Sequence, residues 1–345
     1  MARALILGGT GAIGRATADR LNAAGWTVTI TGRNPAAMPS SLTARGVGFI
    51  RSDRQDHAGP LDQLGPAPDL LVDLVCYTAA DVRAILPFAR AAGSTVLMSS
   101  KAVYVDDEGR SLNADIEPVF DGPITEAQPT LAPRSDIHYD TREGYGANKV
   151  AAEQEYLGSG IPVTVLRPSK VHGPGARRAR EWMFVRRVLD RRPAVFLSDR
   201  GTGIDHTSAA ANVAALIEVV ATAPSARVLN SADPDAPTVL EITRAIASHL
   251  SHDWEEILVD GDALGTNPWQ RDHPIVLDMQ AALALGYQPT GDYPTTVAAT
   301  VDWLVSAANG GEDAALLPTA TDPFFVQLLS YDAEDAYLAA REPDD

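Results

Sequence analysis

The sequence predicts an α/β protein built around a mainly parallel, doubly wound sheet, and three observations support this prediction. A short apolar run at residues 4–7 leads directly into a glycine-rich turn and then a helical pattern. Further apolar, strand-like runs alternate with stretches of helical length, which favours a parallel sheet with helices on both faces. The chain of 345 residues, 45% hydrophobic and 21% charged, is long enough for one large or two coupled domains.

The expected elements follow this alternation along the chain. The first strand covers residues 3–7, and its helix extends to Leu21. Later strands are expected at residues 27–31, 47–51, 70–75, 95–99 and 163–166, with helices at residues 79–92 and 147–157. Beyond Pro168 the candidates are helices at residues 179–192, 209–223 and 238–250 and a strand at residues 227–229. Strand, glycine turn and helix in this order are typical of a Rossmann-type fold that binds a dinucleotide.

These elements divide the chain into a larger and a smaller part. Residues 1–169 form the expected dinucleotide-binding domain, to which about residues 205–230 return. Residues 170–204 and 231–308 form a smaller, interleaved substrate-binding lobe, and residues 309–345 form an acidic tail with an amphipathic helix. The segment 105–144, rich in Asp, Pro and Gly, is too long for an ordinary connection, and the sequence leaves open whether it is a lid.

Composition excludes several classes of function. A formal net charge of -17 disfavours binding to nucleic-acid phosphates. No run approaches the roughly 18 apolar residues that a membrane span needs, and the chain start lacks a long secretory apolar region, so we expect a cytoplasmic protein. Cys76 is the only cysteine, which excludes a disulfide framework or a cysteine-rich metal site. The histidines show no metal-ligand spacing, and we expect no metal.

The glycine-rich turn predicts a phosphate-binding loop. Gly8 permits a tight turn, Gly11 lets the backbone approach a pyrophosphate, and Gly14 allows close helix packing. The loop residues between them, which we also expect at the cofactor, are Thr10, Ala12 and Ile13. The start of the following helix supplies N–H groups and the positive end of its dipole.

The end of the second strand predicts which dinucleotide binds. An NAD enzyme usually presents an acidic side chain there to the ribose 2′-hydroxyl, whereas this chain has Thr31-Gly32-Arg33-Asn34. Arg33 is placed to meet a 2′-phosphate, so NADP(H) is favoured over NAD(H), the alternative being a solvated surface arginine. Asp53, just past the third strand, is a candidate acceptor for the adenine amino group or an ordinary loop aspartate.

Two further segments indicate proton-transfer chemistry. Tyr145 and Lys149 are four residues apart, so on a helix they share one face. A nearby ammonium stabilises a phenolate, which would let Tyr145 exchange a proton near neutral pH. Ser100 follows a predicted strand, at the carboxyl end where ligands bind in such sheets.

The chain resembles the extended short-chain dehydrogenase/reductase family, also called the NAD-dependent epimerase/dehydratase family, over roughly residues 1–305. The matching pieces are Gly8-Gly9-Thr10-Gly11-Ala12-Ile13-Gly14, Ser99-Ser100-Lys101-Ala102-Val103-Tyr104, Tyr145 to Lys149, Leu166-Arg167-Pro168 and Val171-His172-Gly173-Pro174-Gly175. The resemblance implies Tyr145 as general acid/base, Lys149 as a ribose ligand that tunes Tyr145, and Ser100 as the hydroxyl that polarises the substrate oxygen. It also implies that Tyr77 and Pro168 lie beside the cofactor.

The implied activity is an NADP-dependent oxidoreductase or epimerase that moves hydride to or from a carbon bearing oxygen. Reduction, oxidation, epimerisation and dehydration share that step and stay open, as does the substrate: a sugar, a nucleotide sugar or a small polar metabolite. Eight arginines between residues 177 and 200 favour an anionic group on it, the alternative being a solvated helix face with structural salt bridges. The candidate substrate residues are Lys101, Lys170, His172, Arg177 and Arg178.

Departures from the family pattern limit what the resemblance implies. Asp205 takes the place where nucleotide-sugar members often have an arginine, which argues against that substrate class. Only three of the 28 basic residues are lysines, and all three lie in matching segments, which supports ammonium chemistry at Lys149.

A homodimer is expected from family habit. The alternative function is a non-catalytic dinucleotide-binding regulator or RNA-associated protein on the same fold.

Overall fold

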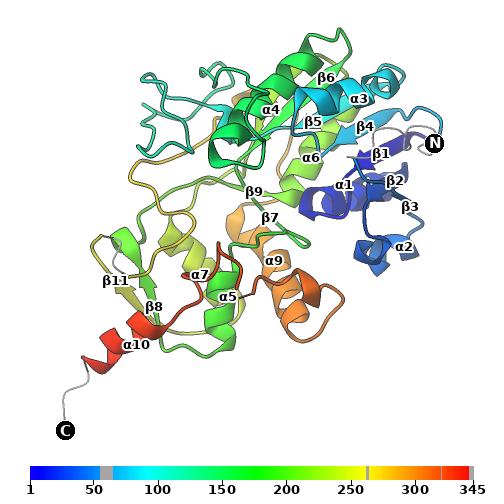
Figure 1. The fold of residues 1–345 in the computed structure, drawn as a ribbon. Helices are drawn as coiled ribbons and strands as arrows, with labels where there is room; N and C mark the ends of the chain where they lie inside the picture. The colour runs from blue at the N-terminus through cyan, green and yellow to red at the C-terminus, as the bar shows by residue number, and fades with distance from the viewer. Residues whose placement is uncertain (55–64, 262–263, 320, 342–345) are drawn as a thin grey trace.

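A seven-stranded parallel sheet forms the centre of the computed structural model, which describes residues 1–54, 65–261, 264–319 and 321–341 (Figure 1). Its strands are β1 (Arg3–Leu7), β2 (Thr27–Gly32), β3 (Gly48–Arg51), β4 (Leu70–Asp73), β5 (Ser94–Met98), β6 (Val163–Pro168) and β10 (Arg227–Ser231). They lie in the order β10-β6-β5-β4-β1-β2-β3. The chain therefore winds outward from β1 in one direction and from β4 in the other, which confirms the predicted doubly wound Rossmann-type sheet.

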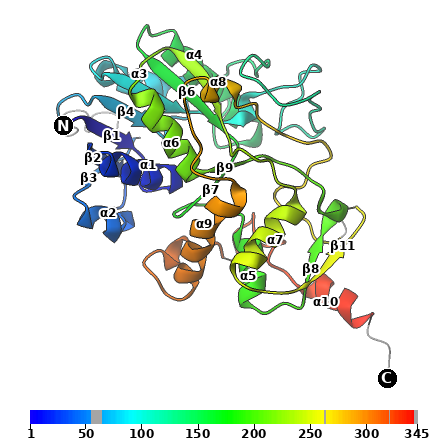
Figure 2. The same ribbon diagram turned by 180° about the vertical axis from the view of Figure 1, so that it is seen from behind.

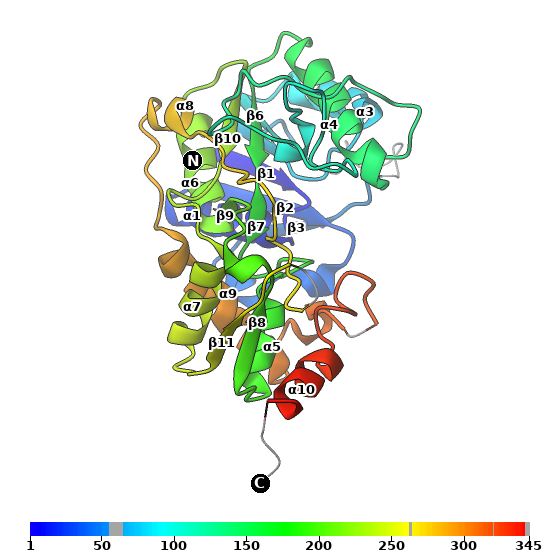
Figure 3. The ribbon, with the colours of Figure 1, turned by 90° about the vertical axis from the view of Figure 1, so that its left-hand side faces the viewer.

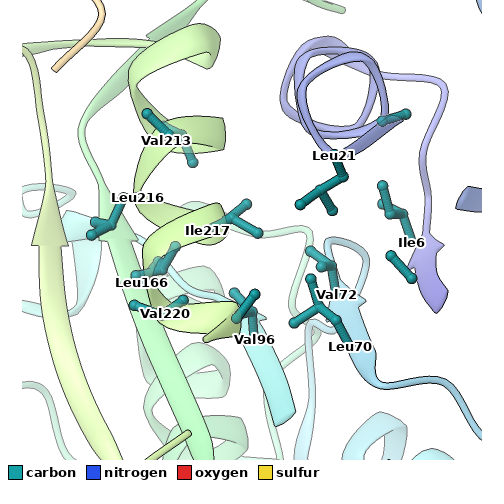
Figure 4. Packing of buried hydrophobic residues seen from close by; sticks show 14 of the residues in the cluster. Ile6, Leu21, Leu70, Val72, Val96, Leu166, Val213, Leu216, Ile217 and Val220 are labelled. Carbon is teal, nitrogen blue, oxygen red and sulfur yellow. The ribbon is translucent and has the colours of Figure 1, made fainter. Parts of the chain in front are cut away.

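Helices cover both faces of this sheet. Successive side chains of each strand point to opposite faces, so apolar residues on both faces need to be covered. The helices α1 (Ala12–Ala23), α2 (Ser40–Ala44) and α6 (Ala210–Ala221) cover one face, and α3 (Ala79–Ala89) and α4 (Arg142–Leu157) cover the other. Val72 and Val96 pack against the first group, whereas their neighbours Leu71 and Leu97 pack against the second. Figure 4 shows Leu21 of α1 directed toward the sheet. Each fully buried Leu, Ile or Val stabilises the fold by about 1.5–3 kcal/mol.

A second, smaller lobe lies beside the sheet (Figures 2 and 3). It contains α5 (Trp182–Leu189), β8 (Ala194–Leu197), η4 (Ser198–Gly201), α7 (Val239–His249), β11 (Glu255–Leu258) and α9 (Tyr293–Ala308). Trp182, Phe184 and Trp269 are buried at its centre. The chain returns to the sheet between α5 and α7 to form α6 and β10, so the two lobes are interleaved.

The structure also contains several short elements. They are β7 (Lys170–His172), which pairs in parallel with β9 (Thr207–Ala209), the 3-10 turns η1 (Pro35–Ala37), η3 (Lys101–Val103) and η5 (Ala314–Leu316), and α8 (Gln280–Leu283). None of the helices in the described ranges is long and apolar enough to cross a membrane.

Helix boundaries differ from the sequence prediction at α4 and α5. The side chain of Thr141 accepts a hydrogen bond from the N–H of Gly144 at 3.0 Å, which caps α4 and starts it at Arg142 instead of residue 147. Tyr145 consequently lies in the first turn of α4. The helix α5 is shorter than predicted, because the chain turns away at Arg191, where φ is 53°.

The C-terminal tail packs on the smaller lobe. Residues 324–329 form turns instead of the expected helix, with Phe325 buried in the lobe core, and α10 (Asp332–Ala339) is the α-helix in the described part of the tail. Glu334 of α10 forms a buried ion pair with Arg187 of α5, with Nη2 and Oε1 at 2.5 Å. The tail thus contributes to the interior of the lobe.

The long segment 105–144 is held at several points, although its residues up to 141 form isolated bridges and turns in place of helix or strand. The N–H of Ile124 donates to the carbonyl of Val276 at 2.8 Å. Glu126 accepts from the N–H of Asn230 at 2.7 Å, and Glu117 pairs with Arg271 at 2.9 Å. These contacts tie the segment to β10 and to the connection that precedes α8.

A buried polar network connects the two lobes at β7 and β9. The Nε2 atom of His172 lies 3.1 Å from Asp233 Oδ2, and its Nδ1 lies 3.3 Å from the hydroxyl of Thr300 on α9. Asp233 also accepts from the hydroxyl of Thr207 at 2.7 Å and from the N–H of Ala209 at 2.6 Å. Although burial opposes it, the contact with Asp233 raises the pKa of His172 above its ordinary value.

We expect stability to depend on pH through this pair. Because the folded pKa of His172 is raised, its stabilisation is fully present below the unfolded pKa of about 6.5 and is lost as pH rises through the folded pKa. His172→Gln should therefore lower the free energy of unfolding by about 1–3 kcal/mol near pH 6 and by less near pH 9. Urea unfolding at both pH values checks this, with exposed His273→Gln as the control. An equal loss at the two pH values would contradict it.

Candidate active site

The loop between β1 and α1 requires glycine at two positions. Gly8 has φ +78°, and a Cβ there would lie 2.3 Å from Cγ1 of Val75. A Cβ on Gly14 would lie 2.5 Å from Cα of Gly9, so the start of α1 packs directly on the loop backbone. A side chain at position 14 would push α1 away from the loop, and one at position 8 would clash with Val75 and strain the backbone.

The first turn of α1 suits a bound anion. Gly11 occupies the N-cap position without any side-chain cap, the first turn has no acidic residue, and a Cβ on Gly11 would meet no described atom within 4 Å. Half-buried Thr10 and Ile13 and buried Ala12 complete this turn. Uncapped N–H groups and open space above them fit the pyrophosphate of a dinucleotide.

Arg15 fixes this loop from the other side. Its Nε donates to the carbonyl of Thr10 at 2.7 Å, and its Nη1 and Nη2 contact the carboxylate of Asp313 at 2.5 and 3.0 Å. Asp313 also accepts from the indole of Trp303 at 2.8 Å. A residue near the C-terminus thus supports the turn at the N-terminus.

The residues expected to select the cofactor lie at strand ends. Arg33 follows β2 and is exposed. The neighbouring side chain of Asn34 accepts from the N–H of Ala36 at 3.0 Å and caps η1. Asp53 lies exposed just after β3.

Tyr145 and Lys149 lie together on α4. Lys149 is 3% exposed, and its Nζ donates to the carbonyls of Cys76 at 2.7 Å and Met98 at 3.0 Å. The same Nζ lies 5.8 Å from the ring centroid of Tyr145 and 4.6 Å from that of Tyr77. The ammonium is therefore fixed beside the Tyr145 ring by backbone at the ends of β4 and β5.

Ser100 approaches the same place from β5. Its hydroxyl oxygen accepts from the N–H of Ala102 at 3.1 Å, which leaves the hydroxyl proton available to a ligand. A Cβ on Gly146 would lie 2.4 Å from the carbonyl oxygen of Ala102. Glycine at this position therefore lets the first turn of α4, with Tyr145, lie directly against η3. Pro168 is buried at the end of the adjacent strand β6.

Another tyrosine near the site is unsuited to proton transfer. The Tyr104 hydroxyl is buried and donates to Oδ1 of Asn230 at 2.6 Å. Burial raises the pKa of Tyr104 to about 12 despite the guanidinium of Arg167. Tyr104 therefore stays protonated at neutral pH, and half-buried Tyr145 is the better candidate.

The sequence prediction missed Tyr139, which lies in the segment 105–144. Its ring stacks on that of Tyr77, with centroids 4.9 Å apart and planes at 19°. Because Tyr77 also lies under the ammonium of Lys149, the two tyrosines form an aromatic wall on one side of the site. Tyr139 stands outside every motif and in a segment without periodicity, so no sequence signal identified it.

Three cations converge on one buried carboxylate beside Ser100. Asp205 is 0% exposed and contacts Nζ of Lys101, Nζ of Lys170 at 3.2 Å and Nε of Arg271 at 3.0 Å. Lys170 also donates to the carbonyl of Pro268 at 2.7 Å. The structure therefore groups two of the expected substrate residues, and adds Arg271, which the sequence did not indicate.

The other expected substrate residues lie elsewhere. His172 is buried in the Asp233 network with both ring nitrogens near protein groups, so we assign it a structural role. Arg177 and Arg178 are exposed, and the guanidinium of Arg178 lies 5.7 Å from the ring centroid of Phe324 in the tail. Within the described ranges, no group of three His, Cys, Asp or Glu side chains is arranged to hold a metal ion.

Known structures share this architecture. The dTDP-glucose 4,6-dehydratase from Bacillus anthracis in complex with NAD has a TM-score of 0.68 at 15% sequence identity, covering 92% of this chain and 100% of that one. The dTDP-glucose 4,6-dehydratase from Streptomyces venezuelae gives 0.66 at 20% identity, covering 90% and 99%. The UDP-glucuronic acid 4-epimerase from Bacillus cereus, in complex with UDP-glucuronic acid and NAD, gives 0.64 at 16% identity, covering 88% and 99%.

Sequence comparison identifies the family directly. No curated protein sequence matches the chain. The model of the NAD dependent epimerase/dehydratase family, however, matches residues 4–230, which is more than half of the chain and includes the glycine loop, Ser100, Tyr145 and Lys149. The resemblance inferred from the motifs is therefore confirmed, and the protein belongs to the NAD-dependent epimerase/dehydratase family of enzymes.

Proposed function

We propose that this enzyme transfers hydride between a nicotinamide dinucleotide and an oxygen-bearing carbon of its substrate, with Tyr145 as general acid/base. The observation that carries the proposal is the grouping of Ser100, Tyr145 and Lys149 at the carboxyl ends of β4 and β5, in a chain whose glycine loop suits a pyrophosphate. Ligands of doubly wound folds bind at this edge of the sheet.

Each residue has a distinct role in this proposal. The hydroxyl of Ser100 donates a hydrogen bond to the reacting oxygen and orients it. Tyr145 donates a proton to that oxygen or accepts one from it. The buried ammonium of Lys149 stabilises the phenolate of Tyr145 while the phenol has lost its proton. When bound, the nicotinamide supplies or accepts the hydride.

We infer that the substrate is a nucleotide sugar or a related small hydroxylated carbonyl compound with an anionic group. The support is that similar structures were solved with UDP-glucuronic acid or named for dTDP-glucose, and that cations gather beside Ser100. Asp205 replaces a family arginine, so phosphate contacts must come from other residues. The expected homodimer and cytoplasmic location stay predictions.

The catalytic prediction concerns the Tyr145 phenol. Tyr145→Phe should lower turnover by about 100- to 10,000-fold because it removes the proton donor and acceptor, with little change in cofactor affinity. Turnover is measured by chromatography of the sugar products together with absorbance at the nicotinamide band, with dTDP-glucose, UDP-glucose and UDP-glucuronic acid as substrates, because epimerisation and dehydration regenerate the cofactor and cause no net absorbance change. Tyr337→Phe, on an exposed tyrosine of α10, is the control. Full turnover by Tyr145→Phe would reject Tyr145 as the general acid/base, whereas cofactor binding without turnover by the unmodified protein would favour the non-catalytic regulator.

The cofactor prediction concerns Arg33. We propose a preference for NADP(H), since Arg33 is exposed at the end of β2 and residues 31–34 include no carboxylate. Arg33→Met should weaken NADPH binding about tenfold and leave NADH binding unchanged, because only NADPH carries the 2′-phosphate. Fluorescence titration of both cofactors checks this. Tighter binding of NADH than NADPH by the unmodified protein would reject the preference and agree with the NAD found in the similar structures.

A further inference from the structure

The cations beside Ser100 exceed their acidic partners. Lys101, Lys170 and Arg271 share the one carboxylate of Asp205, and Arg271 has a second partner in Glu117 at 2.9 Å. The two lysines therefore have no carboxylate of their own. Burial lowers the pKa of both well below the ordinary value, and the neighbouring positive charges lower it further.

Arg180, in the turn before α5, adds a fourth cation without a carboxylate partner. It makes no ion pair with any described residue, and its buried Nε has no hydrogen-bond partner among them. After burial, its charge is the main cause that depresses the pKa of Lys170, and it also acts on Lys101. Burial raises the pKa of the neighbouring Glu181 carboxyl, although the charges of His172 and Arg180 act to lower it, and Glu181 forms no ion pair with Arg180.

This arrangement lies next to the reacting groups. Lys101 directly follows Ser100 in η3, and Tyr145 is one of the groups whose charge acts on Arg180. Lys170 begins β7, just beyond Pro168 at the end of β6. Three chain segments thus bring basic side chains close to Ser100 and Tyr145, two of which share the carboxylate of Asp205 and one of which makes no ion pair with a described residue.

We propose that Lys101, Lys170 and Arg180 form a subsite for an oxyanion, a carboxylate or a phosphate, that the substrate carries close to its reacting carbon. This inference rests on the proposed function and deepens it. Without ligand, Asp205 holds the two lysines in place. A bound oxyanion supplies the negative charge that Arg180 lacks, and it accepts charge-assisted hydrogen bonds from groups that are already desolvated and oriented.

The subsite makes specificity depend on charge at one end of the substrate. A neutral hydroxymethyl group there would leave the buried Nε of the half-buried Arg180 side chain without a partner, whereas a carboxylate would pair with the guanidinium. The enzyme should therefore distinguish an acidic sugar from its neutral counterpart, even when both carry the same nucleotide.

The test uses UDP-glucuronic acid and UDP-glucose, which differ by this carboxylate, and cofactor-loaded enzyme in isothermal titration calorimetry. We expect UDP-glucuronic acid to bind about tenfold more tightly. Lys101→Met and Arg180→Met should each remove most of this preference without changing cofactor affinity. Arg180 has no ion pair to lose, so its variant should fold even if Lys101→Met does not. The control is Arg90→Met, on an exposed arginine after α3.

Equal binding of the two sugar nucleotides, or full preference in both variants, would overturn the subsite. If cofactor binds but neither sugar nucleotide does, the nucleotide-sugar substrate of the proposed function fails, and the subsite is tested by itself with glucose 6-phosphate against glucose. Binding of the phosphorylated sugar that Arg180→Met abolishes would support the subsite and assign it to phosphate. Equal binding of the two sugars, or none, would reject it.

Discussion

The position of one buried ammonium determines the rest of the site. Lys149 reaches from α4 to the carbonyls of Cys76 and Met98, so one charged group joins the helix to the ends of two neighbouring strands. A charge in such surroundings is stable only when hydrogen-bond acceptors surround it. This requirement fixes how α4 is rotated about its own axis. It therefore also fixes the position of Tyr145, which lies one helical turn before Lys149.

Three other features of the fold support this position of Tyr145. The parallel strands end at one edge, where β4 and β5 offer free carbonyls because their hydrogen-bond ladders stop there. Glycines at 144 and 146 let the first turn of α4 lie against the backbone of His138 and Ala102. The long segment 105–144 then packs against the next turn of α4, where Asn148 donates to the carbonyl of Ile137 at 2.8 Å.

The fold class can be predicted from the sequence because the features that indicate it are local. Apolar runs, glycines and helical periodicity identify β1, the turn and α1, and the motif series identified the family, which the family comparison confirms. The start of α4 was placed five residues late, since it depends on one cap by Thr141. The partners of Asp205 come from distant segments without a shared motif, so only tertiary structure brings Arg271 and Arg180 toward Lys101.

The contact between Arg15 and Asp313 has a consequence for how the protein folds during its synthesis. The ribosome releases Arg15, directly after the glycine loop, 298 positions ahead of Asp313, so the nascent Rossmann domain emerges with this arginine lacking its carboxylate partner. The cofactor loop reaches its final support only after residue 313 has been synthesised and has folded back onto it. A chain that stops before residue 313 would therefore keep every motif of the family and still lack that support.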